Sequence, residues 1–427
     1  MSSIPAQPSV CGPGPAALSG RPPIRAGLAV RLLSALLLAL LVSLPTVAAA
    51  TEQSLSQPTF QALQSAQELL EAGEPAAAIE RLERLLAATA KRPYEQAVTL
   101  QTLGHAHLAQ DDYAGAIDRF TRSLELGVLP NEAAQRLRYN LAQLHLASED
   151  YPAALAQLKS WFEAEPEPGA EALVLLGSLY LQLQRYRDAL PPLHTAIERS
   201  EQPREPWYQA LLGAYYELQD YQRCEQLLRE MLQRFPERGT YWRQLSGIHL
   251  LRDDYAGALE VMELAYLGGH LEAERDLLNL VQLYRHGEAP YKAAALAQRE
   301  IERGHIEASP ENWELVANAW IAAREVERAI AALERAGSAG GAAELGLQLA
   351  RLHIERHEWP EAVETLQPLL KRERLEVDAR GRGWLLLGIA RYELGRLGEA
   401  RQAFEQALEY EQTGRDAEQW LAFIADR

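Results

Sequence analysis

Cysteine, methionine and phenylalanine are scarce in this chain of 427 residues, which holds two, three and six of them. The apolar content of 48% is made mainly of leucine and alanine, which suits helices that pack through small contacts. A single hydrophobic core at this length would usually split into several domains. An array of repeats has no such limit, because each unit touches only its neighbours. The composition therefore favours an array of helices over one central core.

Acidic residues are absent from residues 1–50, which carry three arginines, the last of them Arg31. The apolar run Leu32–Leu44 follows; at about 13 residues it is too short to span a bilayer comfortably and is typical of a signal-peptide core. Small residues at Ala48–Ala50 then offer a cleavage site. We predict that residues 1–50 are a secretory signal peptide and expect no stable membrane insertion after its removal. An uncleaved anchor and a translation start downstream of Met1 remain alternatives.

Basic residues are also few, and the formal charge of the chain is −17. Removing residues 1–50 takes away three arginines and no acid, which makes the charge −20. Such an acidic chain is a poor nucleic-acid binder, because neutralising phosphates requires a basic surface. Only one cysteine, Cys224, follows residue 50, so the mature chain has no intramolecular disulfide. We expect the Cys224 thiol to be buried in a helix contact.

Catalytic signatures are missing as well. The sequence has no Gly-x-Ser-x-Gly elbow, no His-Glu-x-x-His pair and no phosphate-binding loop. We therefore predict a protein that is not an enzyme, with no catalytic residues and no cofactor. Histidine is the remaining metal ligand to consider. Four histidines recur three residues after a small residue and are interpreted as packing residues rather than metal ligands: His107, His145, His249 and His353.

The stretch Asn312–Ala336 shows what the chain does contain. Trp313, Val316, Ala317 and Trp320 recur at i, i+3, i+4 and i+7, which places them on one face of a helix. A tight turn is expected at residues 323–325, and a second helix follows with Ala329, Leu333 and Ala336 on its facing stripe. Neither helix can bury its stripe alone, so the pair requires stacked neighbours on both sides.

The same pattern returns ten times at a spacing near 34 residues, and it resembles the tetratricopeptide repeat. The small residue of its Leu-Gly pair, which we number position 8, is assigned to Ala66, Gly104, Ala142, Gly177, Gly213, Ser246, Val281, Ala317, Ala350 and Gly388. A second small residue falls twelve positions later in nine repeats: Ala78, Ala116, Ala154, Ala189, Ala258, Ala293, Ala329, Ala362 and Ala400. In the fifth repeat Cys224 takes this place, with a turn expected to be one residue shorter.

The predicted fold class is all-α, a right-handed α-solenoid of about ten tetratricopeptide-type helix pairs with a C-terminal capping helix. We expect a leader at residues 51–58, the repeats at residues 59–415 and the cap at residues 416–427. In the cap, Ala417, Trp420, Leu421 and Ile424 share one apolar face. A polar opposite face is what the end of a repeat stack must present to water.

The resemblance also implies where a partner would bind. In repeats of this type the first helix of each pair lines the inner, concave wall, and positions 2, 5, 9 and 12 point outward from it. Polar and aromatic side chains there would hold a segment of a partner protein. The residues predicted to form this partner-binding wall are Tyr139, Gln143, Trp207, Arg243, Arg275, Gln282, Arg285, Asn318, Arg351 and Arg382.

Four strings resemble a narrower family, the exported tetratricopeptide-repeat protein that accompanies TonB–ExbB–ExbD energy-transducing systems in Gram-negative bacteria. They are YKAAALAQREIERG, ENWELVANAW, WLLLGIARYELGRLGEARQAFEQA and AEQWLAFI. The resemblance implies a periplasmic, non-enzymatic scaffold whose partners are TonB-, ExbB- or ExbD-type components. The alternatives are a scaffold for outer-membrane protein or peptidoglycan assembly and, from another class, an envelope hydrolase hidden in the repeats.

Overall fold

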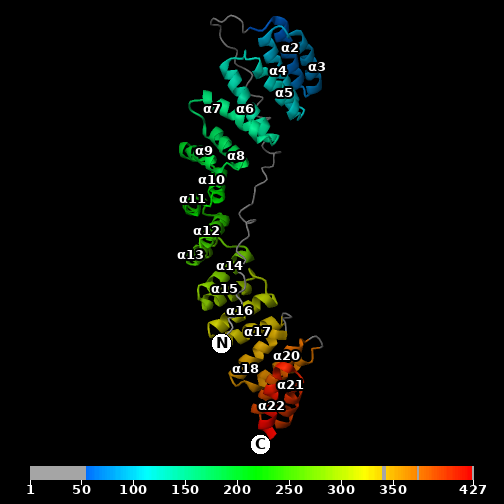
Figure 1. Cartoon of the computed structure of the whole chain (residues 1–427), viewed down its shortest axis with the longest axis vertical. Coiled ribbons are helices and arrows are strands. Elements are labelled where there is room, and N and C mark those ends of the chain that lie inside the picture. The colour runs from blue at the N-terminus through cyan, green and yellow to red at the C-terminus, as the bar shows by residue number, and fades with distance from the viewer. Residues whose placement is uncertain (1–53, 339–342, 373–374, 426–427) are drawn as a thin grey trace. The chain divides into compact units, whose positions relative to one another are not determined.

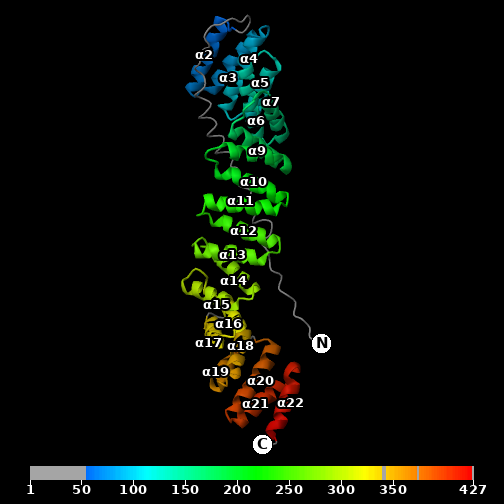
Figure 2. The same cartoon turned by 90° about the vertical axis from the view of Figure 1, so that its left-hand side faces the viewer.

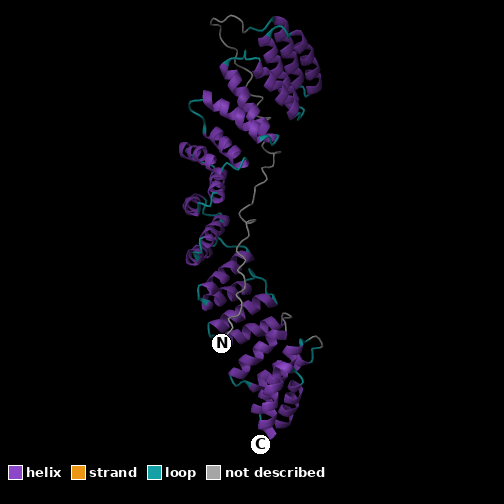
Figure 3. Ribbon diagram, in the orientation of Figure 1, coloured by secondary structure: helices purple, strands orange, loops and turns teal. Residues whose placement is uncertain are grey.

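The computed structural model describes residues 54–338, 343–372 and 375–425, and the predicted signal peptide lies outside these ranges. The described residues form 21 α-helices joined by short loops and contain no strand (Figure 3). The all-α prediction is therefore confirmed. The chain divides into two compact units, one ending at Leu227 and one starting at Leu228, which we call the N-terminal and C-terminal units.

Helices follow one another in pairs, which we call the A and B helices of each repeat. The N-terminal unit contains α2 (Gln57–Glu71), α3 (Pro75–Ala88), α4 (Pro93–Leu108), α5 (Tyr113–Glu125), α6 (Asn131–Ala147), α7 (Tyr151–Ala164), α8 (Ala170–Gln182), α9 (Tyr186–Arg199), α10 (Glu205–Glu217) and the first part of α11 (Tyr221–Arg234). The first helix begins within the expected leader. There Ser56 donates its backbone N–H to Glu95 Oε1 at 3.0 Å.

The C-terminal unit contains the rest of α11, then α12 (Gly239–Leu251), α13 (Tyr255–Leu267), α14 (Glu274–His286), α15 (Pro290–Glu302), α16 (Pro310–Ala322), α17 (Val326–Ser338), α18 (Ala343–Glu355), α19 (Trp359–Leu370), α20 (Val377–Glu393), α21 (Leu397–Leu408) and α22 (Glu411–Ala425). The last helix begins at Glu411 rather than Asp416. Its first turn is held because the buried Thr413 hydroxyl donates to the carbonyl of Ala407 at 2.8 Å.

Stacking is the same in both units (Figures 1 and 2). Most A helices pack on their own B helix, as α4 does on α5 and α16 on α17, and most B helices also pack on the next A helix. Consecutive A helices touch directly as well, for example α8 with α10 and α18 with α20. This is the arrangement of an α-solenoid, in which each repeat buries its apolar stripes against its neighbours.

The turn between the two helices of a pair has one recurring conformation. In nine repeats the residue seven positions after position 8 has a positive φ, and in the fifth repeat Gln219, six positions after Gly213, has one as well; the values lie between 55° and 77°. These residues are Gly73, Asp111, Glu149, Gln184, Gln219, Asp253, Glu288, Arg324, His357 and Gly395. Glycine adopts this left-handed conformation without strain, whereas other residues pay a steric cost. Eight repeats therefore hold a strained turn residue that the stacked helices keep in place.

Position 8 is small because the B helix lies directly over it. A Cβ added to Gly388 would come within 2.5 Å of the Phe404 ring, and one added to Gly104 within 2.3 Å of the Phe120 ring. Both rings are fully buried. The glycine thus makes room for an aromatic side chain from the paired helix.

The fifth repeat corrects our register by one residue. Gly213 is exposed, whereas the preceding Leu212 is buried and lies twelve residues before the buried Cys224. The turn residue with positive φ, Gln219, is seven residues after Leu212, as in every other repeat. Leu212 therefore occupies position 8, and the turn is not shorter. The glycine had suggested position 8, but the burial of Leu212 and the place of the turn residue decide the register.

Candidate protein-binding surfaces

Tyr139 and Gln143 lie one turn apart on α6 and are both partly buried. The Tyr139 ring packs against Trp161 at 5.1 Å between centroids, and its hydroxyl shares a hydrogen bond with Gln143. Burial raises the pKa of Tyr139, so the hydroxyl stays protonated near neutral pH. The two residues form a neighbouring aromatic and amide pair, and their place on a partner-binding wall stays a prediction.

Trp207 does not lie on an exposed wall. Only 4% of its surface is exposed, and it packs with Leu173 and Ala196 in a hydrophobic cluster. The predicted exposure was wrong because of the register in this repeat: with Leu212 at position 8, Trp207 falls at position 3 instead of position 2. It is a core residue between neighbouring repeats.

Arg243 on α12 is paired with a buried acid of the next repeat. Its guanidinium donates to Asp276 Oδ2 at 2.8 Å, and the Asp276 side chain is completely buried in the first turn of α14. The pair joins two repeats across 33 residues of sequence. The neighbouring Arg275 is 73% exposed, with its Nε 3.7 Å from the same carboxylate. Of these two arginines, Arg275 is the one turned to solvent.

Arg382 also links repeats. It forms a forked ion pair with Glu344, with distances of 2.8 and 2.9 Å from its two terminal nitrogens to the two carboxylate oxygens. This geometry fixes the guanidinium more firmly than a single contact. Local sequence patterns could not predict this ion pair, because Glu344 is 38 residues away.

The remaining predicted residues lie on three A helices of the C-terminal unit. Gln282 and Arg285 are exposed on α14, and the Arg285 guanidinium donates to Gln282 Oε1 at 3.0 Å. Asn318 on α16 accepts a 3.0 Å hydrogen bond from Gln348 on α18. Arg351, one turn after Gln348, is exposed. Gln348 is thus a wall residue that sequence reasoning missed.

The four histidines at position 11 each face an acid that begins the B helix. Nδ1 of each histidine approaches a carboxylate oxygen, at 2.8 Å in three repeats and 3.5 Å in the fourth: His107–Asp112, His249–Asp254, His353–Glu358 and His145–Asp150. Across the ranges that the structure describes, no three His, Cys, Asp or Glu side chains gather as a metal site would require.

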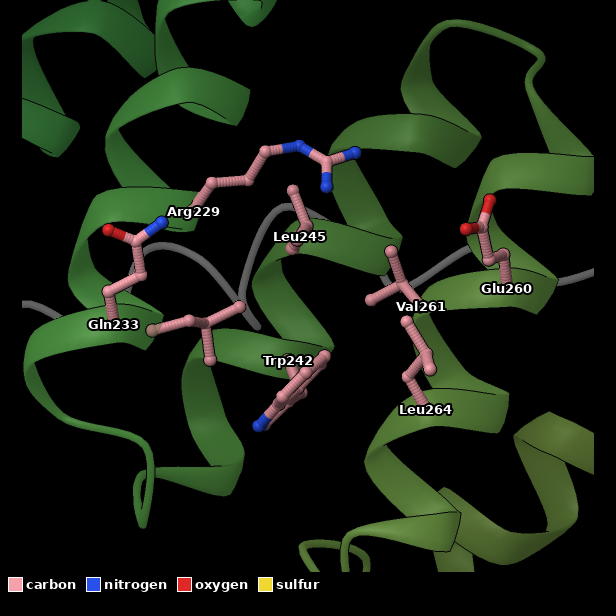
Figure 4. A pocket seen from close by; sticks show the side chains of 8 residues that line it. Arg229, Gln233, Trp242, Leu245, Glu260, Val261 and Leu264 are labelled. Carbon is pink, nitrogen blue, oxygen red and sulfur yellow. The ribbon is translucent and has the colours of Figure 1, made fainter.

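A cavity of about 230 Å³ opens in the C-terminal unit between α11 and α13, with α12 as its floor (Figure 4). We call it the α12 pocket. Its lining is mainly apolar, with polar groups at two edges: Arg229, Leu232, Gln233, Trp242, Leu245, Glu260, Val261 and Leu264. None of these residues had been predicted as functional. The lining mixes exposed residues of the B helices, such as Arg229 and Glu260, with buried ones such as Leu245, so periodicity alone did not reveal the opening.

Comparison with known proteins identifies the repeat. The family model described as tetratricopeptide repeat matches residues 102–167, 139–206, 209–274 and 347–417, more than half of the chain. The chain belongs to the tetratricopeptide-repeat family. Its helix pairs, small position 8 and recurring turn are the structural form of that repeat.

Several solved tetratricopeptide-repeat proteins are similar to this one. A protein from Parabacteroides merdae is 19% identical, with 70% of this chain and 100% of that one covered and a TM-score of 0.36. The C-terminal part of a repeat protein from Cytophaga hutchinsonii is 15% identical, with coverages of 64% and 93% and a TM-score of 0.38. MamA from Desulfovibrio magneticus is 20% identical, with coverages of 50% and 98% and a TM-score of 0.29. No curated protein matches the sequence.

Membership of the tetratricopeptide-repeat family indicates a protein-interaction scaffold with protein partners. The match identifies the repeat and not a particular cellular system. Within the described ranges, no helix combines the length and apolar character needed to cross a membrane.

Proposed function

We propose that this tetratricopeptide-repeat protein is a non-enzymatic scaffold whose A helices hold a segment of a partner protein. The main support is the row of exposed or partly exposed polar side chains on α14, α16 and α18: Gln282, Arg285, Asn318, Gln348 and Arg351. Arginine makes forked contacts to carboxylates and is common at binding hot spots. The partner segment is therefore acidic or polar.

We further propose that the scaffold works in the periplasm as an accessory to a TonB-type energy-transducing system. The support is the likeness of four sequence strings to that family and the acid-free residues 1–50 with their apolar run. Scaffolding of outer-membrane protein or peptidoglycan assembly is the rival. Neighbouring genes for ExbB- and ExbD-like proteins support the first role, and their absence favours the rival.

Binding to purified periplasmic parts of the host's TonB- and ExbD-type proteins tests the wall. Replacing Arg285 and Arg351 together by alanine should weaken the complex by about 2 kcal/mol or more. Wild-type binding should also weaken as salt is raised. Arg401→Ala on the exposed side of α21 is the matched control. Equal affinity of the double variant and the control would show that the A helices are not the binding surface.

Export has a separate test. The intact mass of the protein purified from its native host should correspond to a chain that begins near Thr51. A mass that retains Leu32–Leu44 would contradict cleavage and with it the proposed periplasmic form.

A further inference from the structure

The α12 pocket lies on the side of α12 that faces away from the A-helix wall. Trp242 and Leu245 are three residues apart and share one face of the helix, whereas Arg243, predicted for the wall, lies roughly 100° or more around it. All eight lining residues belong to the C-terminal unit. The pocket is therefore a second surface, independent of the proposed function.

The equivalent groove two repeats later is filled by the protein's own side chains. There Trp313 stands in place of Trp242, and the Arg335 guanidinium lies 4.8 Å above its ring. Arg335 also approaches Glu302 at 4.0 Å, which closes the groove between α15 and α17. In the α12 pocket, Leu264 occupies the position of Arg335 and Gln233 the position of Glu302. Neither the cation over the ring nor the closing ion pair can form.

What remains is an apolar opening with exposed leucines at its edge. Leu264 is 50% exposed, and Leu267, one turn further along α13, is 74% exposed. Large apolar side chains left in water at the rim of a pocket mark interaction sites. A dry cavity of roughly 150 Å³ accepts a benzene-sized molecule. A space of about 230 Å³ therefore takes a phenylalanine or leucine side chain.

The two edges of the pocket carry opposite charges. Arg229 and Gln233 project from α11, and Glu260 projects from α13 on the other side (Figure 4). A partner that fills the pocket meets a basic edge on one flank and an acidic edge on the other. Leu264 and Leu267 are spaced i, i+3, the spacing of the ridge that an apposed helix packs against.

We propose that the α12 pocket receives a large aliphatic or aromatic side chain from an amphipathic helix of a partner protein. That helix carries acidic residues on the flank facing α11 and basic residues on the flank facing α13. The partner's helix replaces the covering that Arg335 and Glu302 provide internally for Trp313.

The test uses a fluorescent, alanine-rich helical peptide of about 18 residues. It carries Phe and Leu at i, i+3, with Glu along one flank and Lys along the other. Fluorescence anisotropy with the full chain should show saturable binding. Leu264→Gln should weaken binding at least tenfold, whereas Leu408→Gln, at an equally exposed leucine on the B helix α21, should not. Exchanging the Glu and Lys flanks should weaken it several-fold.

Four results would overturn the proposal. Three of them are the absence of saturable binding, equal affinities of the two leucine variants, and equal affinity for peptides with either order of the charged flanks. A fourth is self-association of the wild type, seen by sedimentation, that Leu264→Gln alone abolishes; the occupant would then be a second copy of this chain. Loss of binding in the Arg285 and Arg351 variants bears only on the A-helix wall.

Discussion

The carboxylate of Asp254 joins two helices at once. Its Oδ2 lies 2.8 Å from Nδ1 of His249 at the end of α12, and its Oδ1 accepts the backbone N–H of Gly257 in the first turn of α13 at 2.9 Å. His107 and Asp112 repeat this arrangement with Gly115. In these two repeats one acid therefore caps the B helix and fixes the histidine that fills position 11.

Asp254→Ala should lower the melting temperature by about 2–4 °C, because it removes both contacts. The hydrogen bond from Gly257, and then that from His249, holds the pKa of Asp254 below its usual 3.8. A lowered folded-state pKa stabilises the fold above the unfolded pKa, and this stabilisation is lost as pH falls through the lower value. The difference in melting temperature between Asp254→Ala and the wild type should be largest at pH 6–7 and should disappear toward pH 2. Glu364 is an exposed residue of α19 and serves as the control: Glu364→Ala should change neither the melting temperature nor its dependence on pH.

Gly388→Ala should destabilise the C-terminal unit by about 1–3 kcal/mol, because the new methyl group would meet the buried Phe404 ring. Gly398→Ala is the control: it is also helical, but an added Cβ there has nothing within 4 Å. It should be neutral or stabilising by up to about 1 kcal/mol. Urea denaturation of both variants makes the comparison, and equal midpoints would contradict the packing described for position 8.

Gln184→Gly should stabilise the N-terminal unit by about 0.5–1 kcal/mol. Its φ of 57° strains a side chain, whereas glycine adopts this conformation freely. Gln182→Gly, the same substitution at the last residue of α8, should instead cost about 0.5–1 kcal/mol. Thermal unfolding should thus show opposite signs for two changes only two residues apart. Changes of the same sign would argue against a strained turn.

Arg243→Ala should cost about 2–3 kcal/mol, since it leaves the buried carboxylate of Asp276 without its closest cation. Arg275→Ala, at an exposed arginine beside the same carboxylate, should cost about 0.5 kcal/mol or less. Adding Asp276→Asn to Arg243→Ala should recover part of the loss. If the two single variants have similar urea midpoints, Arg243 is a surface residue after all and becomes available to a partner.

The Cys224 thiol should be unreactive in the folded protein. Burial raises its pKa to about 12, so the thiolate fraction at pH 8 is roughly one in ten thousand. In a Cys11→Ser background, a colorimetric thiol assay should detect no fast-reacting group until denaturant is added. Rapid labelling of the native protein would show that α11 opens readily around this residue.

The helix pairs and their spacing could be read from the sequence. The stripe of Trp313, Val316, Ala317 and Trp320, and the small Ala329 opposite it, belong to one stretch of fewer than 30 residues. Helical periodicity is a local property, so it predicted α16, the turn at residues 323–325 and α17 in agreement with the structure.

The roles of individual surface residues were decided only by the tertiary structure. Trp207 is buried against Leu173, and Arg243 is held by Asp276 in the next repeat. Such contacts join side chains a full repeat apart, and repeat consensus fixes the backbone but not which residues meet across it. The α12 pocket has the same origin: Leu264 stands at the repeat position that Arg299 and Arg335 occupy elsewhere, and only the structure shows a cavity beside it. The cavity stays open because Leu264 and Gln233 cannot form the ion pair that closes the groove beside Trp313, and that is a property of two stacked repeats rather than of either one.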